Sequence, residues 1–412
     1  MGAKGAMMLE AIASAEEAEA VHNSSQAAAA LVGRRFPYGT AGFRARGDAL
    51  GRVAFRCGLL AALRAHAVGG GRATGVVVTA SHNPAQDNGI KLIDGDGGML
   101  HASWEKHAEA LVAAADGSEV AAAASAIIDD ERIDVGGDPP IVLVARDTRP
   151  TGPALLAAVM RGVVAAGGVP SGDADTVRTT PQLHWQVMAR NGGAPHALDD
   201  YYAALTEGCA GLRDLLAIPP AGSADGAMGC VVVDCANGVG AAAMARVCPS
   251  IEALGYCRPT LANEGGPSDG SALNRGCGAD YVQKQRRAPD ARPAEFWARA
   301  AASQNSHVIG ASLDGDADRV VFFAPPNSPT SPTSPPEGKG EGEGMGGMGG
   351  GEVSLMDGDK VAALVAGFLF ETLATCSPFL DPAPRVGVVQ TAYANGASTA
   401  FLSQTLGCEV LW

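Results

Sequence analysis

The sequence predicts an α/β fold of several domains. Two observations carry this prediction. From Val76 onward, short and almost continuous apolar runs alternate with longer Ala- and Leu-rich stretches, and strands that are covered on both faces have this continuous apolar character. The chain has 412 residues, which is enough for two or three domains. Alternating strands and helices imply mostly parallel sheets with crossover helices.

Apolar runs mark the predicted strands in chain order. Five of them read as buried strands: Gly75–Ala80, Ile141–Ala145, Cys230–Asp234, His307–Leu313 and Val386–Ala392. Helical stretches are expected between them, at Pro153–Ala166, Asp199–Leu216 and Asp359–Leu373. Val320–Phe323 and Glu352–Leu355 read as the two strands of a hairpin.

Composition shifts suggest the domain boundaries. We predict a disordered tail over residues 1–32, a first domain over 33–195, a second over 196–356 and a partial third over 357–412. The tail is Ala-rich and acidic, which fits neither a secretory signal nor a transit peptide. Residues 325–352 are a low-complexity insert, first rich in Pro, Ser and Thr and then in Glu, Gly and Met. Such an insert buries too little apolar surface to offset its ordering entropy, so we expect a disordered loop there.

The charge balance limits the partners of the chain. Its formal net charge is −14, which argues against a general affinity for nucleic acid or for an anionic membrane. An anionic small substrate stays possible, because a pocket needs only its own local cations. The nine cysteines include no C-x-x-C pair, so we expect reduced thiols in a cytoplasmic protein. No apolar run approaches the ~20 residues of a membrane span, and no obligate protein partner is predicted.

The first group of residues with chemical potential follows the strand that begins at Gly75. The segment Thr79–Pro84 reads T-A-S-H-N-P, and Pro84 disfavours helix at the residue before it. Ser81 is therefore predicted in a loop at the carboxyl end of a strand, where open α/β sheets bind their ligands. His82 and Asn83 can hydrogen-bond a phosphate. Lys91 follows an Asp-Asn-Gly turn signal at residues 87–89 and can return to the same site as a point charge.

The second group is the acidic loop D-G-D-A-D-R at residues 314–319. Asp314, Asp316 and Asp318 follow another apolar strand, and three carboxylates at alternate positions can converge on one hard cation such as Mg²⁺. Crowded carboxylates repel one another, so a bound ion explains them better than a solvated acidic turn. Arg319 adds a fixed cation beside the metal. A calcium-binding EF-hand is excluded, because Arg319 and Pro325 stand where that loop needs Gly and Glu.

Two weaker motifs contain glycine or arginine near predicted strands. In the segment 36–44, Gly42 and Thr40 lie in a turn that can approach an anion, and Arg44 can clamp that anion. The R-D-T-R segment at residues 146–149 is similar, but its Asp and Arg are expected to form a structural ion pair.

A competing interpretation rests on Gly238 and Gly240. These glycines and Ala243 give G-x-G-x-x-A after a predicted strand, as in dinucleotide-binding folds, with Glu264 as the ribose-binding acid. A lone match of this kind is weak, and close packing of a helix on a strand explains the same glycines. This alternative, a nicotinamide-dependent oxidoreductase, predicts that NAD protects the fold.

The motifs together provide the groups that phosphoryl transfer needs: a nucleophile, a divalent cation and fixed positive charges. They resemble those of the α-D-phosphohexomutase family, whose serine motif is T-A-S-H-N-P or close to it and whose metal loop is D-G-D-x-D-R. Within that family the chain is similar to the phosphoacetylglucosamine mutase branch. The segments that carry this similarity are Tyr38–Arg44, Thr79–Lys91, Thr179–His184, Val233–Gly240, Asn274–Tyr281 and Val389–Gly396.

The resemblance implies interconversion of N-acetylglucosamine 6-phosphate and 1-phosphate, a step toward UDP-N-acetylglucosamine, on mixed-sheet α/β domains. By this analogy Ser81 is carried as phosphoserine, and a hexose or N-acetylglucosamine 1,6-bisphosphate serves as activator. Mg²⁺ would be held by Ser81 and the three aspartates. Lys91, Arg44 and Arg319 would stabilise the transferring group, and Lys91 or His82 would move the hydroxyl proton.

The sequence also departs from the family pattern. Relative to the family's four domains, the third domain is expected to be incomplete and the fourth absent, because no E-x-N-G-H-like or R-P-S-G-T-E-like segment occurs. Two further interpretations stay open for this reason. One is a phosphoglucomutase or phosphomannomutase, and the other is a truncated, catalytically silent homologue.

Overall fold

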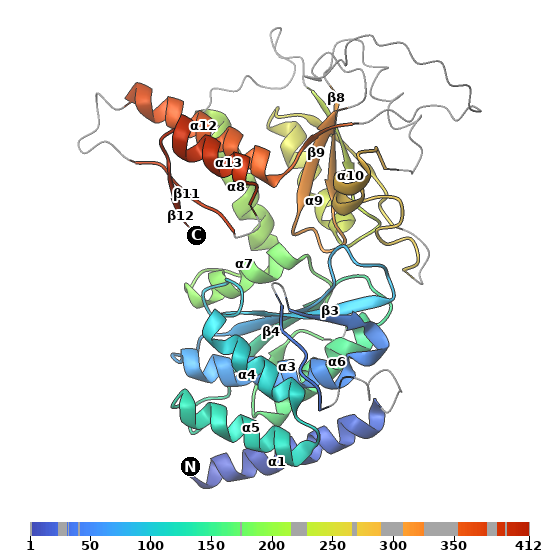
Figure 1. The fold of residues 1–412 in the computed structure, drawn as a ribbon, viewed down its shortest axis with the longest axis vertical. Helices are drawn as coiled ribbons and strands as arrows, with labels where there is room; N and C mark the ends of the chain where they lie inside the picture. The colour runs from blue at the N-terminus through green and yellow to red at the C-terminus, as the bar shows by residue number, and fades with distance from the viewer. Residues whose placement is uncertain are drawn as a thin grey trace.

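The computed structural model describes the chain as two five-stranded sheets with their helices and a smaller third unit (Figure 1). The described residues are 2–23, 31, 33–39, 42–173, 175–215, 229–265, 270–289, 308–324, 353–376, 385–391 and 394–411. Thr40 and the predicted disordered insert at residues 325–352 lie outside them.

The first sheet has the strand order β1-β3-β2-β4-β5. Its strands are β1 (Phe43–Arg46), β2 (Thr74–Val78), β3 (Asp87–Ile93), β4 (Ile141–Arg146) and β5 (Val169–Ser171). The predicted strands at Gly75 and Ile141 are confirmed as β2 and β4, which pair in parallel and are almost wholly buried. Helical cover accounts for this burial, since strands buried on both faces need apolar residues on both.

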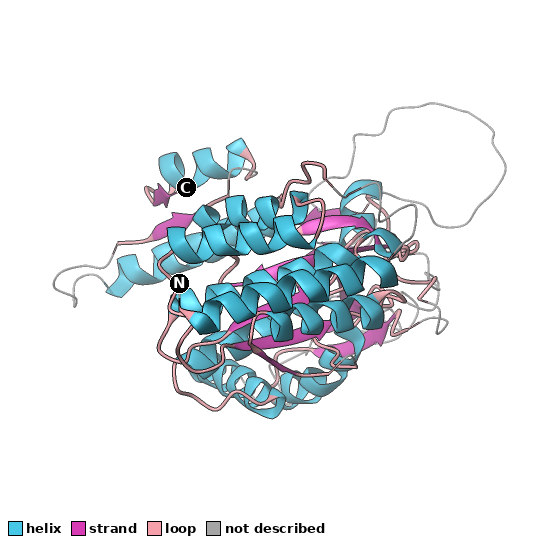
Figure 2. Ribbon diagram, turned by 90° about the horizontal axis from the view of Figure 1, so that it is seen from below, coloured by secondary structure: helices cyan, strands magenta, loops and turns pink. Residues whose placement is uncertain are grey.

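Helices cover both faces of the first sheet. On one face lie α3 (Gly51–Val68), α4 (Ala102–Ala113) and α6 (Gly152–Ala165), with α5 (Gly117–Asp130) in a further layer, and a 3₁₀ turn at Gly47–Ala49 precedes α3. On the other face lies α7 (Thr180–Asn191), which begins with a complete capping box between Thr179 and Gln182. Figure 2 shows the first group of helices from below, in front of the strands. The predicted helix at Pro153–Ala166 is confirmed as α6.

The sheet is mixed because β3 runs antiparallel to both of its neighbours, β1 and β2. The predicted Asp-Asn-Gly turn at residues 87–89 is wrong, since these residues begin β3 and the chain reverses earlier, between Ser81 and Gln86. Gly89 is needed in the strand for close approach, because a Cβ there would lie 2.6 Å from the Thr79 carbonyl oxygen. The consequence is that Lys91 lies directly opposite Val77 of β2.

The second sheet has the order β10-β9-β8-β6-β7. Its strands are β6 (Cys230–Asp234), β7 (Arg258–Ala262), β8 (Val308–Leu313), β9 (Val320–Ala324) and β10 (Ser354–Met356), with the helices α8 (Leu198–Leu215), α9 (Gly240–Ala253) and α10 (Ala279–Gln285) around them. β8 is parallel to β6 and antiparallel to β9, and the predicted hairpin is confirmed as the antiparallel pair β9–β10. β2 of the first sheet has the same kind of neighbours, so Ser81 and Asp314 follow corresponding strands.

The third unit contains α12 (Gly358–Cys376), β11 (Gly387–Val389), α13 (Gly396–Ala400), a π-helical turn (Phe401–Thr405) and β12 (Glu409–Leu411). β11 and β12 form a parallel pair. α12 and β11 confirm the predicted helix and strand of this region. Within the described part of the chain, none of the helices is both long and apolar enough to cross a membrane.

The predicted disordered tail is wrong for most of its length, because residues Ala3–His22 form helix α1. α1 packs against α5, α6 and α3, and Figure 1 places it at the outer edge of the first unit. Its buried side chains Ile12, Glu16 and Glu19 are spaced by four and three residues, which puts them on one helical face. The partners of the two glutamates explain their burial: Glu16 accepts from Arg56 and Glu19 from Arg161.

Replacing Glu16 tests this docking. Arg56 is 1% exposed, so Glu16→Ala leaves a buried guanidinium without its carboxylate, and the free energy of unfolding is expected to fall by about 3–5 kcal/mol. Urea unfolding measures the change, and Glu17→Ala on the exposed face of α1 is the control. Equal stability of the two variants would contradict the packing of α1 on the first unit.

Candidate functional site

Ser81 lies in the turn that follows β2, as the sequence predicts for it. The residue is buried, and its φ of 52° places it in the left-handed region, which costs energy for a residue other than glycine. Hydrogen bonds hold this conformation: the Ser81 N–H donates to Thr79 Oγ1 at 3.1 Å, and that hydroxyl donates to Asp147 Oδ2 at 2.7 Å. The serine side chain is thus presented by a rigid turn.

Asp314, Asp316 and Asp318 converge after β8. Each offers an oxygen within 4.8 Å of the others, and in the described part of the chain this is the group that could hold a metal ion. The Asp316 and Asp314 side chains are fully buried, and Asp316 Oδ1 has no hydrogen-bond partner. An unpaired buried carboxylate oxygen is costly unless a cation or a proton meets it. The three carboxylates therefore fit a hard divalent cation such as Mg²⁺.

The serine turn and the acidic loop touch each other, although they are more than two hundred residues apart in sequence. Ser81 Oγ donates to Asp314 Oδ2 at 2.5 Å. Gly315 permits this approach, since a Cβ at that position would lie 2.6 Å from the Ser81 carbonyl oxygen. The structure therefore brings the predicted nucleophile and the predicted metal ligands into one site.

Two cations lie against the acidic loop. Lys91 Nζ donates to Asp316 Oδ2 at 2.8 Å and to Asp318 Oδ2 at 2.7 Å, and Arg319 Nε donates to Asp314 Oδ2 at 2.9 Å. Arg319 Nη2 also reaches Ser81 Oγ at 3.5 Å. Lys91 thus returns to the site as predicted, but its contacts in the structure are carboxylates.

The charges around the acidic loop shift the pKa values of Asp314 and Asp316 in opposite directions. Burial and the neighbouring charges of Asp316 and Asp318 raise the pKa of Asp314 from 3.8 to about 7. Burial acts against ionisation of Asp316 as well, but Lys91 outweighs it and lowers the pKa of that carboxyl. A cation bound at Asp314 would favour its ionised form and so counteract this rise in pKa, which agrees with a metal site.

The other predicted residues lie around the serine turn. His82 is half-buried, and its Nδ1 has no hydrogen-bond partner. Burial and the charge of Arg319 lower the pKa of His82, so its ring is neutral near pH 7. Asn83 donates to Asp87 Oδ2 at 3.2 Å and so stabilises the turn. Arg44 lies on β1 opposite Gly89 and has a buried Nε without a partner. At Gly42, with a φ of 96°, a Cβ would meet the Ile90 carbonyl oxygen.

Sequence reasoning missed three residues that support the site. Arg149 forms the predicted ion pair with Asp147 at 3.0 Å, but its guanidinium also donates to the carbonyls of the serine turn. Asn274 donates to the Ser81 carbonyl from the second sheet's side at 2.8 Å, and Thr180 Oγ1 donates to Asp316 Oδ2 at 2.8 Å. Asn274 and Thr180 lie within the segments that carry the family resemblance, and that resemblance is the signal that could have identified them.

Packing accounts for the glycines that suggested a dinucleotide site. A Cβ at Gly238 would lie 2.4 Å from the Gly315 carbonyl oxygen, and one at Gly240 would lie 3.1 Å from Cβ of Ala317. The Val239 N–H donates to the Gly315 carbonyl at 3.1 Å. These residues thus form the surface on which the acidic loop rests.

Gly238→Ala is expected to weaken metal binding by at least about 10-fold, because groups behind the ligands commonly control affinity by 10–100-fold. The added methyl must push the Gly315 carbonyl aside and thereby move Asp314 and Asp316. Calorimetric titration with Mg²⁺ measures the affinity. Gly211→Ala in α8, where a Cβ meets nothing within 4 Å, is the control, and an unchanged affinity in Gly238→Ala would count against this support.

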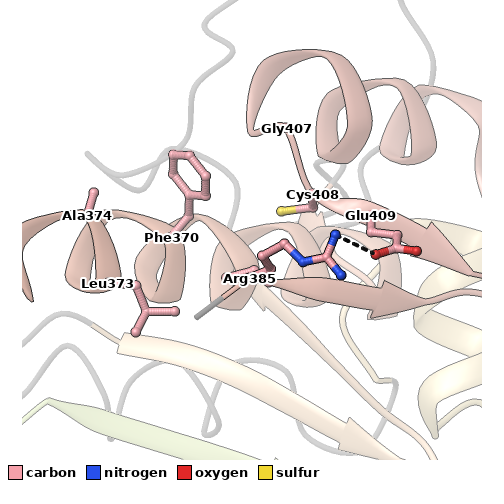
Figure 3. A pocket seen from close by; sticks show the side chains of 8 residues that line it. Phe370, Leu373, Ala374, Arg385, Gly407, Cys408 and Glu409 are labelled. Carbon is pink, nitrogen blue, oxygen red and sulfur yellow. Dashed lines mark ion pairs between the residues drawn. The ribbon is translucent and has the colours of Figure 1, made fainter. Parts of the chain in front are cut away.

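An open cleft adjoins the metal loop. It has a volume of about 490 Å³ and is lined by Asp318 and Arg319 of the second unit and by Asp357, Asp359 and Thr391 of the third. Pockets of a few hundred Å³ suit small molecules. A second pocket, of about 500 Å³, lies between α12 and the β11–β12 pair. Phe370 and Leu373 line it from α12, and the ion pair Arg385–Glu409 lines its other side (Figure 3). None of the predicted site residues lines that pocket.

Known proteins are similar to this chain in sequence and in fold. Residues 357–412 match the family described as phosphoacetylglucosamine mutase AMG1, domain III, and residues 59–119 match phosphoglucomutase/phosphomannomutase, alpha/beta/alpha domain I. A solved apo-form of an N-acetylglucosamine-phosphate mutase, described as a member of the alpha-D-phosphohexomutase superfamily, is 30% identical with a TM-score of 0.71; the match covers 96% of this chain and 76% of that one. The chain belongs to this superfamily.

Several curated relatives of the chain are named phosphoacetylglucosamine mutase. The phosphoacetylglucosamine mutase of Oryza sativa subsp. japonica is 38% identical over 388 residues, which make up 92% of this chain and 62% of the relative. The chain thus spans about three fifths of the length of the curated relatives it matches.

Two structures of the Aspergillus fumigatus mutase give the ligands of relatives. One, with a TM-score of 0.70 and 30% identity, is in complex with GlcNAc-6P and magnesium; it covers 98% of this chain and 65% of that one. The other, a serine-to-alanine variant with a TM-score of 0.74 and 31% identity, holds glucose 1,6-bisphosphate over the same shares of the two chains. The predicted mixed-sheet α/β fold is confirmed by these neighbours.

Proposed function

We propose that the chain carries the phosphoserine and metal half of a mutase that interconverts N-acetylglucosamine 6-phosphate and N-acetylglucosamine 1-phosphate. The observation that supports this most is the contact of Ser81 Oγ with Asp314, inside a ring of three carboxylates and two cations. The reaction would proceed through a phosphorylated Ser81 and a bisphosphorylated sugar. Its product class places it before the formation of UDP-N-acetylglucosamine.

In this proposal each residue of the site has its own role in phosphoryl transfer. Ser81 accepts and returns the phosphoryl group, while Arg319 and Arg44 supply fixed positive charge to it. Mg²⁺ held by Asp314, Asp316, Asp318 and a Ser81 oxygen would serve as Lewis acid and template. Of the two proton carriers left open by the sequence, we favour His82, because Lys91 Nζ is already engaged by two carboxylates.

The remaining parts of the proposal concern ligands and compartment. The cleft beside Asp318 and Arg319 would bind the phosphorylated amino sugar, and a hexose or N-acetylglucosamine 1,6-bisphosphate would phosphorylate Ser81 first. Gly42 and Asn83 would line the path of the phosphate. The cysteines that the structure describes are free thiols, which suits a reducing cytoplasm.

³¹P NMR tests the proposal in two steps. The chain is first mixed with Mg²⁺ and glucose 1,6-bisphosphate, and wild type is expected to gain a phosphoserine signal that Ser81→Ala lacks. N-acetylglucosamine 6-phosphate is then added, and a 1-phosphate signal is expected to appear with wild type alone. The first step examines only transfer of a phosphoryl group to Ser81, for which this chain contains the serine, the three aspartates and the neighbouring cations. A wild type that gains no phosphoserine would refute the proposed chemistry of Ser81.

A further inference from the structure

One buried guanidinium organises the backbone of the serine turn. Arg149 is fully buried. Its Nη1 donates to the Pro84 carbonyl at 2.6 Å and to the Asp87 carbonyl at 2.8 Å, and its Nη2 donates to the Ser81 carbonyl at 3.1 Å and to the Asn83 carbonyl at 2.8 Å. Four carbonyls of one short turn therefore point inward at a single cation.

The orientation of Arg149 is itself fixed. Its Nε donates to Asp147 Oδ2 at 3.0 Å and its backbone N–H to Asp147 Oδ1 at 2.9 Å, so all five N–H donors of the side chain are engaged. The same Asp147 Oδ2 accepts from Thr79 Oγ1, which in turn accepts from the Ser81 N–H. Both backbone groups of Ser81, its N–H and its carbonyl, thus connect to the Asp147–Arg149 pair.

A second donor reaches the same turn from the other unit. Asn274 Nδ2 donates to the Ser81 carbonyl at 2.8 Å and to the Asn83 carbonyl at 3.3 Å, the two carbonyls that Arg149 Nη2 also binds. Asn274 has a φ of 56°, and its own N–H donates to the Ala236 carbonyl at 3.0 Å. The turn is therefore held between the first sheet's unit and the second.

We propose that Arg149 and Asn274 are positioning residues. They hold the Ser81 backbone in its left-handed conformation and keep the carbonyls of the serine turn pointed away from the incoming phosphate. This inference rests on the function proposed above. A left-handed non-glycine residue persists only where its surroundings enforce it. Carbonyl oxygens that faced a phosphate would repel its charge, whereas carbonyls bound to Arg149 and Asn274 leave the Ser81 side chain free to meet Asp314 and Arg319.

Arg149→Lys tests the first half of the proposal. Lysine keeps the charge but offers three donors from one point, so it cannot satisfy the four carbonyls and Asp147 together. The rate of Ser81 phosphorylation by glucose 1,6-bisphosphate, measured by intact mass, is expected to fall about 100-fold, as small misplacements of reacting groups do. Arg56→Lys is the matched control, since Arg56 is also buried and donates to two carbonyls, those of Val112 and Ala114.

Asn274→Asp tests the second half and keeps the proposal testable if Arg149→Lys does not fold. The variant has the shape of asparagine but places a carboxylate against the two carbonyls, and phosphorylation of Ser81 is expected to slow on the order of 10-fold. Asn191→Asp is its control, because the Asn191 amide also bridges two carbonyls, of Ala73 and Gly95, away from Ser81. A rate in Asn274→Asp equal to that of its control would overturn the role of Asn274.

Two further readouts separate positioning from general stability and from the proposed function. Mn²⁺ affinity is expected to stay within about 3-fold of wild type in Arg149→Lys, because the side-chain donors of Arg149 go to Asp147 and to the serine turn and not to the three aspartates. Hydrogen–deuterium exchange of the peptide spanning residues 79–91 is expected to accelerate in Arg149→Lys and to stay unchanged in Arg56→Lys. This exchange result does not require turnover, so it remains decisive even if wild type forms no phosphoserine. Unchanged exchange in Arg149→Lys would overturn the proposal.

Discussion

Lys91→Met is expected to destabilise the metal-free chain by about 3–5 kcal/mol, the usual result of breaking a buried ion pair. Lys91 is buried and bridges Asp316 and Asp318. Methionine fills the volume of the lysine stem but leaves Asp316, which is fully buried, beside two other carboxylates. Their mutual repulsion is then opposed by Arg319 alone among the cations that contact the loop in the described structure.

Mg²⁺ is expected to restore part of this stability, because a divalent ion at the three carboxylates replaces the missing charge. Urea unfolding in EDTA and in saturating Mg²⁺ measures both effects, and the gain from Mg²⁺ should be larger in Lys91→Met than in wild type. Lys284→Met is the control: Lys284 is exposed and pairs with the half-buried Asp280, so the loss of this pair should cost less than about 1 kcal/mol. Equal losses in the two variants would show that Lys91 does not neutralise the loop.

The strands that carry the site could be predicted from sequence, because their apolar runs reflect burial on both faces. β2, β6 and β8 lie where Gly75, Cys230 and His307 begin such runs. Strand β3 was missed for a physical reason. Its Asp-Asn-Gly start has the composition of a turn, and the glycine is required by close contact with the Thr79 carbonyl, which no local pattern reveals.

Residues that act through distant partners were not predictable in the same way. In the sequence, Glu16 and Glu19 look like the acidic residues of a solvated tail. Only the fold shows that they form ion pairs with arginines on α3 and α6. Arg149 was expected to form an ion pair, but its hydrogen bonds to backbone carbonyls leave no pattern of side chains in the sequence. That Ser81 and Asp314 belong to one site could be predicted, because phosphoryl transfer needs both a nucleophile and a metal ion. The hydrogen bond between them is seen only in the structure.

Asp314→Asn is expected to abolish metal binding and yet to stabilise the metal-free chain at about pH 8, by on the order of 1–4 kcal/mol, because the raised pKa of Asp314 shows that the fold disfavours its charged form. Burial, Asp316 and Asp318 raise the pKa of Asp314 from 3.8 to about 7. The folded chain therefore binds this proton more tightly than the unfolded chain, and stability falls as the pH rises through that interval. Above the folded pKa the whole penalty is present, and asparagine removes it while still accepting a hydrogen bond from Ser81.

The difference between Asp314→Asn and wild type should shrink toward about pH 5, where the folded wild type already carries the proton on Asp314. Urea unfolding in EDTA across this range measures the difference, and Asp214→Asn is the control, because Asp214 is an exposed carboxylate that also pairs with an arginine. Adding Mg²⁺ should reverse the order at about pH 8, because wild type gains binding energy that the variant lacks. A variant less stable than wild type in EDTA at that pH would mean that Arg319 outweighs the repulsion among the carboxylates, and that the acidic loop is held together without an ion.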